Sequence, residues 1–368
     1  IGYEDRAVVS PPELEVAGAD KWENQVGTGP FMFEEYVIGS HMSLVRNPNY
    51  WDTTVINGVE YQLPFMDRVV LPIIPDAATR FAALRTGTTD LYFMVPPEQW
   101  DALDRVAPDL QKIESVGGQG GSVNFWCGSP PFDDVKVRRA MMIGTNIKEL
   151  QKLWMGEGMA IHWFPTLPGD PGYIPMEELP ADIRILYDYN PTLAKQMLED
   201  ALGPPDADGF FFKTKIWTRT VPTTNVDQAA LLKDQWTEIG VEAEIEARET
   251  SEMHTILYSI PPRWTGVASG GEYQQAWPYM AFAMSERTGA ALNTSQYSNL
   301  ELDALIDEMD LELDPVKQNL LVKEATLILL RDVERIPGSL RPQVALNNTT
   351  EIAIHLGEES HPASILNR

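Results

Sequence analysis

A strand, a helix and a second strand follow one another in the second half of the chain, and this unit restricts the fold most. Residues 214–217 have the composition of a strand. Apolar residues then recur with helical spacing over 231–239, and Gly240 is placed to end that helix. Residues 241–246 alternate apolar side chains with glutamates, as a strand with one buried face does. This order predicts an α/β fold in which helices flank a sheet.

The charge balance excludes several classes of partner. Lys and Arg number 28 and Asp and Glu number 54, so the formal net charge is −26. Phosphate backbones are bound by Lys/Arg surfaces, so we expect no nucleic-acid binding. An anionic membrane surface would repel the chain for the same reason. Cys127 is the only cysteine, which excludes a disulfide within the chain, and we interpret it as a buried, inert thiol in a strand.

Motifs of known chemistry are missing from the sequence. No histidine stands in a His-Glu-x-x-His pattern, and no Gly-x-Ser-x-Gly or phosphate-binding loop occurs. Asp206 and Asp208 resemble the start of a calcium loop, but Lys215 stands where the chelating glutamate belongs, so we predict a turn there. We therefore expect no catalytic residue, no metal ligand and no cofactor. The chain has many carboxylates, so their number does not exclude one catalytic alternative, a glycosidase-type pair of acids.

Several motifs in a fixed order carry a resemblance to a known family. Residues 27–31 read Gly-Thr-Gly-Pro-Phe, and residues 46–51 read Arg-Asn-Pro-Asn-Tyr-Trp. Further motifs follow at 130–140, 189–198, 236–241 and 297–303. Together they resemble the family 5 extracellular solute-binding proteins, which serve ABC importers of oligopeptides, dipeptides, nickel and some oligosaccharides. The resemblance runs from about Val26 to Ser339.

The resemblance implies an α/β, bilobed, periplasmic-binding-protein-like fold (type II, cluster C), with two mixed-sheet lobes joined by a hinge. Residues 1–118 would be part of lobe one, 119–340 lobe two, and 341–368 a C-terminal return to lobe one. The glycine cluster at 117–121 is a candidate hinge. In the family the Gly-Thr-Gly-Pro motif lies well inside the mature chain, so we expect an N-terminally truncated member that lacks a small extra domain.

The implied function is the extracytoplasmic substrate-binding component of an ABC importer, which captures a peptide-like solute and delivers it to a permease. The protein would be no enzyme, and it would be a monomer when full length. Its location would be periplasmic or extracellular, with a lipid anchor in the preceding segment as one option. Two alternatives stay open: an oligosaccharide-binding member of the same family, and a secreted hydrolase with a carboxylate pair in its cleft.

One segment supplies the first three predicted ligand-binding residues. Family members carry an Asp-Tyr-x-Asp-Pro loop whose acidic residue pairs with the ammonium of a peptide ligand. The nearest match in this chain runs from Glu272 to Pro278 and contains extra residues before the proline. By this resemblance Glu272 would be the charged anchor, and Tyr273 and Trp277 would be walls of the pocket.

Two further segments supply the other candidates. Arg263 could hold a ligand carboxylate through its planar guanidinium, or it could be a solvated surface residue. Trp264 would be a second aromatic wall. Phe125 and Trp126 follow the glycine cluster and could line the floor of a cleft, although one of the two should pack in the core because neighbours on a strand face opposite ways.

Overall fold

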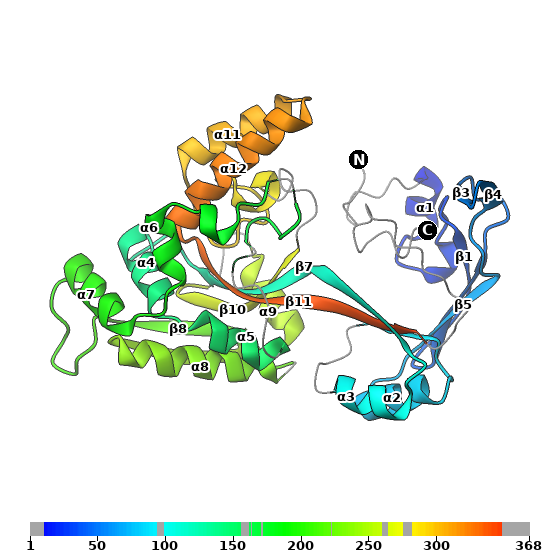
Figure 1. Ribbon diagram of the computed structural model, residues 1–368, viewed down its shortest axis with the longest axis horizontal. Coiled ribbons are helices and arrows are strands. Elements are labelled where there is room, and N and C mark those ends of the chain that lie inside the picture. The colour runs from blue at the N-terminus through cyan, green and yellow to red at the C-terminus, as the bar shows by residue number, and fades with distance from the viewer. Residues whose placement is uncertain are drawn as a thin grey trace. The chain divides into compact units, whose positions relative to one another are not determined.

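A computed structural model describes residues 11–93, 99–155, 162, 164–170, 172–221, 223–259, 264–274 and 282–347. The chain forms two compact units: unit 1 is Ile1–Ser115 with Gln343–Arg368, and unit 2 is Val116–Pro342. These divisions lie three and two residues from the predicted boundaries at 118 and 340. Two long neighbouring strands, β7 (Gln111–Phe125) and β11 (Arg335–Asn347), contribute residues to both units (Figure 1). The assignment of the units as lobes stays a prediction.

Unit 1 contains a small antiparallel sheet and a separate hairpin. The sheet has the order β1-β2-β5, and β3 pairs with β4 in the hairpin. The bounds are β1 Phe31–Val37, β2 His41–Arg46, β3 Thr53–Ile56, β4 Val59–Gln62, β5 Arg68–Pro72 and β6 Leu91–Phe93. The helical segments are α1 Pro12–Ala17, η1 Trp22–Asn24, α2 Ala77–Arg85 and α3 Trp100–Val106.

Local hydrogen bonds explain why the first two family motifs occur together. The Asn47 side chain donates from Nδ2 to the carbonyl of Gly29 at 2.8 Å. Its backbone N–H donates to the carbonyl of Pro30 at 2.9 Å. The asparagine after β2 therefore holds the glycine-rich turn before β1. Asp76 caps α2, because its carboxylate accepts a hydrogen bond from the Thr79 N–H at 2.8 Å.

α1 begins at Pro12, since proline fits the first position of a helix. Aromatic character predicts core packing for Tyr50 and Trp51, but Tyr50 is half-buried and Trp51 is exposed. Trp51 is 74% exposed, and its ring lies 5.8 Å from that of Tyr50. The residues around this pair belong to the β3–β4 hairpin and its approach, which supply no covering layer for the indole.

A six-stranded sheet of order β6-β11-β7-β10-β8-β9 has mixed strand directions. β10 (Val267–Gln274) runs parallel to β8 (Phe212–Arg219) and antiparallel to β7. β8 pairs in parallel with β9 (Val241–Arg248), and α8 (Thr224–Glu238) connects the two. The strand–helix–strand unit predicted from the sequence is therefore present, as the α/β fold requires.

The apolar face of α8 is buried as its spacing predicts. Leu232, Trp236 and Ile239 have no exposed surface. The Trp236 indole N–H donates to the hydroxyl of Thr145 at 2.9 Å, which satisfies the polar atom of a buried ring. Gly240 ends the helix with φ +84°, a conformation that favours glycine.

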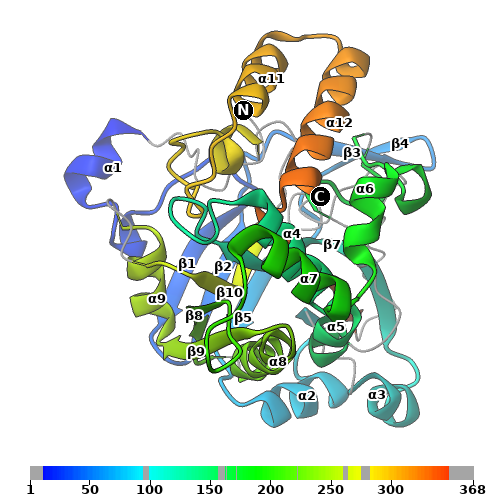
Figure 2. The ribbon, with the colours of Figure 1, turned by 90° about the vertical axis from the view of Figure 1, so that its left-hand side faces the viewer.

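The remaining helices of unit 2 pack on this sheet, most of them in one core, while α9 packs in a separate cluster with Trp264. They are α4 Val135–Ile143, α5 Ile147–Met155, α6 Ala181–Arg184, α7 Pro191–Leu202, α9 Thr250–Leu257, α11 Leu300–Leu311 and α12 Pro315–Asp332, with short η3 Met176–Glu178, η4 Ile185–Tyr187 and a π-helical turn, η5 Phe282–Glu286. Figure 2 shows α11 and α12 projecting from the rest of unit 2 as a hairpin. The apolar spacing over residues 320–329 predicts a helix, which α12 contains, but Leu320 itself is exposed instead of buried. Among the described helices, none has the length and apolarity that crossing a membrane requires.

Candidate functional site

The strand that carries two predicted ligand-binding residues lies beside the glycine cluster. In the β10–β7 ladder, Glu272 pairs with Gly121 and Tyr273 pairs with Gly120. The cluster therefore forms part of a strand. A side chain at Gly338 of β11 would place its Cβ 2.5 Å from the carbonyl oxygen of Gly121, so β11 needs a glycine at this close approach. Trp277 and Arg263 lie outside the described residues.

Trp126 and Trp264 meet next to the other end of this ladder. Their ring centroids are 5.2 Å apart and the planes are inclined by 71°, an edge-to-face arrangement. Trp264 is 1% exposed and packs with Met253 and Leu257 of α9, whereas Trp126 is half-buried. Among the described residues the indole Nε1 of Trp264 has no hydrogen-bond partner. A direct contact between either ring and a solute stays a prediction.

Phe125 packs in the core of unit 2. It has no exposed surface, and its ring stacks on Phe132 with centroids 5.1 Å apart. Its neighbour Trp126 is half-buried, so the two rings differ in burial as neighbours at a strand end do. The contacts of Phe125 are those of a packing residue, and a role in ligand binding remains a prediction for it.

A third tryptophan, predicted only as part of a strand, adjoins this pair. Trp217 packs against the cluster that contains Trp264, and its indole N–H donates to the carbonyl of Thr265 at 2.9 Å. The cationic groups of Lys215 and Arg248 each lie 5.6 Å from its ring centroid. We call Trp126, Trp217 and Trp264 the tryptophan group. The sequence signal was available, because Trp217 ends the predicted strand at 214–217, but only the fold brings the three rings together.

A buried charge cluster lies where β11 begins. Arg335 donates from Nη2 to Glu286 at 2.9 Å, also binds the carboxylate of Glu334, and lies with its guanidinium carbon 4.7 Å from the ring centroid of Phe164. Glu286 and Glu334 are fully buried and Arg335 nearly so. Burial raises the pKa of Glu286 to about 8, since two carboxylates share one cation away from water. Burial therefore favours the protonated form of the Glu286 carboxyl.

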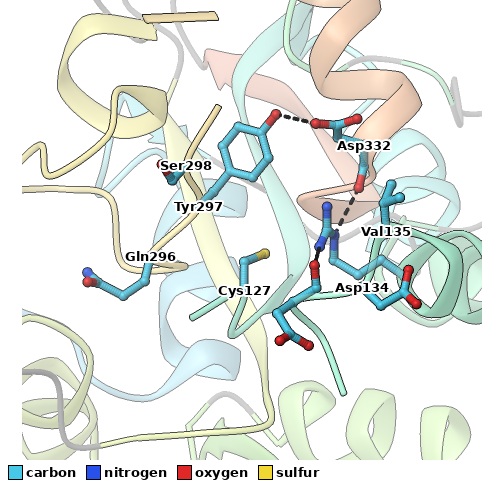
Figure 3. Close-up of a pocket in the computed structure, with 9 residues that line it drawn as sticks. Cys127, Asp134, Val135, Gln296, Tyr297, Ser298 and Asp332 are labelled. Atoms are coloured by element: carbon cyan, nitrogen blue, oxygen red, sulfur yellow. Dashed lines mark hydrogen bonds between the residues drawn. The ribbon is translucent and has the colours of Figure 1, made fainter. Parts of the chain in front are cut away.

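A pocket of about 390 Å³ opens on the surface of unit 2 (Figure 3). Its lining comes from two of the family motifs, from residues just before them and from the end of α12: Cys127, Asp133, Asp134, Val135, Arg138, Gln296, Tyr297, Ser298 and Asp332. The buried Arg138 guanidinium donates to backbone carbonyls, among them that of Phe132 at 2.7 Å and that of Asp332 at 2.9 Å. The Tyr297 hydroxyl donates to the carboxylate of Asp332 at 2.6 Å.

The polar groups of this pocket hold the fold together. Asp134 caps α4 by accepting from the Lys136 N–H at 2.8 Å, so the motif at 130–140 works as a cap and turn. Cys127 follows β7 in a turn and is half-buried, which corrects the prediction of a strand position. Burial raises the pKa of its thiol to about 12, so the thiolate needed for nucleophilic attack is scarce near neutral pH.

His162 also has a structural role. His162 is buried, with one ring nitrogen 2.9 Å from the hydroxyl of Tyr187 and the other 2.8 Å from the carbonyl of Ile174. Its burial lowers the pKa of the imidazole and favours the neutral ring. Within the part of the chain that the structure describes, no three His, Cys, Asp or Glu side chains gather closely enough to hold a metal ion.

The mixed α/β sheet and the long strands shared by two units match the architecture that the sequence motifs predict. The chain belongs to the bacterial extracellular solute-binding proteins of family 5, because the profile described as "Bacterial extracellular solute-binding proteins, family 5 Middle" matches residues 7–298. The family predicted from the sequence motifs is therefore confirmed.

Curated relatives are similar over most of this chain. The glutathione-binding protein GsiB of Salmonella paratyphi A is 26% identical over 339 residues, which cover 90% of this chain and 62% of GsiB. The heme-binding protein A of Haemophilus influenzae is 27% identical over 322 residues, covering 85% of this chain and 54% of that protein. The chain thus spans less than two thirds of the length of these relatives.

Solved structures share the fold. A putative peptide-binding protein, AppA, from Clostridium difficile superimposes with a TM-score of 0.73 at 22% identity, covering 92% of this chain and 67% of AppA. The Helicobacter pylori protein DppA, solved with the peptide STSA, gives a TM-score of 0.70 at 22% identity and covers 91% of this chain and 62% of DppA. The predicted periplasmic-binding-protein-like α/β fold is confirmed.

Proposed function

We propose that this chain acts as the extracytoplasmic substrate-binding component of an ABC importer, capturing a peptide-like solute and delivering it to a membrane permease. The observation that carries the proposal is the family match over residues 7–298. Two similar proteins support a peptide-like solute: GsiB is named for glutathione, and DppA was solved with a tetrapeptide. In this function the protein binds its solute without transforming it and needs no cofactor.

Glu272 is the proposed anchor for the ammonium of the solute. Its strand, β10, pairs with a stretch of β7 whose residues opposite Glu272 and Tyr273 are glycines, so β7 presents no side chain at those positions. Tyr273 and Trp277 would flank the anchor as pocket walls, and Arg263 would bind a carboxylate. These assignments rest on the resemblance of the segment 272–278 to the ligand-facing loop of the family.

The tryptophan group supports a second, aromatic part of the site. Trp126 is half-buried, and the buried indole N–H of Trp264 lacks a partner among the described residues. Trp264 is covered by the core, so the half-buried Trp126 is the ring of this pair that a solute would contact. Aromatic faces also bind sugars, which favours an oligosaccharide as the second candidate solute. Phe125 would support this surface from the core.

Isothermal titration calorimetry with the full-length protein tests the proposal. The probes are reduced glutathione, the peptide Ser-Thr-Ser-Ala, the same peptide with an acetylated N-terminus, and maltotriose. Binding of the free peptides, with no breakdown product by mass spectrometry, is the expected result. Binding of maltotriose alone would transfer the proposal to the sugar-binding alternative, and turnover would support the hydrolase.

Substitution of the anchor sharpens this test. Glu272→Gln should weaken the free-amine peptide by about 1–3 kcal/mol, the range of a hydrogen bond to a charged group, and should leave the acetylated peptide unchanged. Glu244→Gln is the matched control, because Glu244 is an exposed acid on the neighbouring strand β9. Equal affinities of Glu272→Gln and the wild type would remove Glu272 from the site.

A further inference from the structure

The end of the α11–α12 hairpin exposes four large apolar side chains within ten residues. The exposed fractions are 82% for Leu311, 94% for Leu313, 68% for Val316 and 57% for Leu320. We call these four residues the hairpin tip. Single exposed apolar residues are common on protein surfaces, but a concentration of them on a projecting element is typical of an interaction site (Figure 2).

The local structure of the hairpin leaves this apolar surface unused. Asp314 caps α12 by accepting from the Val316 N–H at 2.9 Å. Leu313 precedes the cap, where an apolar residue usually packs against the fourth residue of the helix. That residue is Gln318, whose side-chain amide instead donates to the carbonyl of Met309 at 3.1 Å and so closes the hairpin by a polar contact. Leu313 is left without an apolar partner on its own helix.

The tip is also separate from the core of unit 2. The buried residues of α12 begin at Val322 and continue through Ala325 and Leu329. Val316 and Leu320 are four residues apart and therefore lie on one face of the first turns of the helix, before the buried stretch starts. The first two turns of α12 thus carry an apolar face that the packing of unit 2 does not require.

The charges around the tip indicate the chemistry of a partner. Between residues 308 and 317 the acids are Glu308, Asp310, Glu312 and Asp314, and Lys317 is the only cation. Arg287 lies 3.7 Å from Asp310 and also pairs with Asp307, so it offsets part of this charge. An acidic rim around an apolar centre is complementary to an apolar recess rimmed by Lys and Arg.

The apolar centre and acidic rim of the tip argue against two other partners. A second copy would bring the same acidic tip to a chain of net charge −26, and an anionic membrane surface would repel it. A protein surface that combines apolar and basic residues satisfies both features.

We propose that the hairpin tip docks in an apolar, Lys/Arg-rimmed recess on the extracytoplasmic face of the permease. This inference rests on the proposed function and assigns the surface of unit 2 that meets the transporter. Leu313 and Val316 are the central contacts, and the acids around them steer the encounter. Because a few central side chains carry most of the affinity of an interface, the loss of two of them should be easy to measure.

The test compares two serine variants of exposed residues. Leu313→Ser/Val316→Ser removes the centre of the tip, and Leu300→Ser removes an 81% exposed leucine at the opposite end of α11. Affinity is measured by biolayer interferometry on the membrane subunits of the importer encoded with this protein, held in nanodiscs of neutral lipid. Circular dichroism checks that both variants fold as the wild type does.

We expect the tip variant to bind the permease at least about tenfold more weakly and Leu300→Ser to bind within about twofold of the wild type. Higher salt should slow the association of the wild type, since opposite charges steer it. Equal affinities of the tip variant and the wild type would overturn the inference, and so would equal losses in the two variants.

Other results of these experiments would also decide whether the inference holds. A wild-type dimer that the tip variant abolishes would assign the tip to a second copy, and binding to protein-free anionic vesicles would assign it to the membrane; either result overturns the inference. If the wild type binds a peptide in calorimetry but not the permease, the transport role fails together with the inference. If the wild type binds both and the tip variant loses neither, only the inference fails.

Discussion

Unit 2 and unit 1 differ in how far their apolar residues are buried. In unit 2, Phe125, Trp236, Val267 and Ile306 come from widely separated parts of the chain and are all fully buried in one core. In unit 1 the described core is much smaller. A cluster around Leu84 and Leu103, with Phe81, Tyr92 and Leu110 packed against it, is typical of its size.

The small sheet of unit 1 shows what the difference means. Met32 and Phe33 are neighbours on β1, and Val70 and Leu71 are neighbours on β5; all four are exposed. Since neighbours on a strand face opposite sides of the sheet, neither side is fully covered in the described residues. Stable sheets bury at least one face against a second layer. Unit 2 supplies such a layer from its own helices, whereas the sheet of unit 1 depends on further contacts.

The strongest test of this comparison removes one tryptophan from each unit. Trp236→Ala should lower the free energy of unfolding by about 3–5 kcal/mol, because a fully buried ring leaves a cavity. Trp51→Ala should change it by less than about 1 kcal/mol, because that ring is mostly exposed. Urea unfolding followed by circular dichroism measures both. Comparable losses in the two variants would break the contrast between the units.

The buried charge cluster of unit 2 should make its stability depend on pH. The raised pKa of Glu286, about 8 against an ordinary 4.5, means that the folded chain keeps a proton that the unfolded chain releases. The free energy of unfolding should therefore fall as pH rises from about 5 to 8, by at most about 1.4 kcal/mol per pH unit.

Glu286→Gln tests this prediction. The glutamine carbonyl can still accept from Arg335, but the titrating group is gone, so the variant should lose this slope. Urea unfolding at intervals between pH 5 and pH 8 gives the difference between the two proteins. Identical slopes in variant and wild type would show that Glu286 does not titrate in this window.

The exposed sheet of unit 1 should cause weak self-association of this chain. Sedimentation velocity is expected to show a concentration-dependent rise in the sedimentation coefficient, since large exposed apolar patches associate. Met32→Ser/Val70→Ser should reduce the rise, and Leu202→Ser, an exposed leucine of α7 in unit 2, should not. A monomer at every concentration would mean that unit 1 satisfies its sheet by itself.

Local features of the fold were predictable because short stretches of backbone set them. The β8–α8–β9 unit, the glycine that ends α8 and the aspartate that caps α2 each depend on spacing within a few residues. The order of the motifs likewise identified the family, since each motif can be read without knowing what it contacts. The motifs at 130–140 and 297–303 then proved to line one pocket.

The candidate site was only partly predictable. The sequence indicated Glu272 and Tyr273, and β10 brings their strand to the glycine cluster. It did not indicate that Trp217 joins Trp126 and Trp264, because these residues come from three different strands or loops. Burial also differed from expectation at Trp51 and Leu320, where helical or aromatic character suggested packing.

The sequence alone thus determined the family, the α/β class and the caps and periodicities of single elements. Only the tertiary structure decided which apolar residues are buried. It also placed Glu286 and Arg335 in one buried cluster and left the hairpin tip exposed to solvent. The physical reason is the distance along the chain over which each kind of interaction acts. Backbone geometry links residues three or four positions apart, whereas burial and charge pairing depend on which distant segments fold over them.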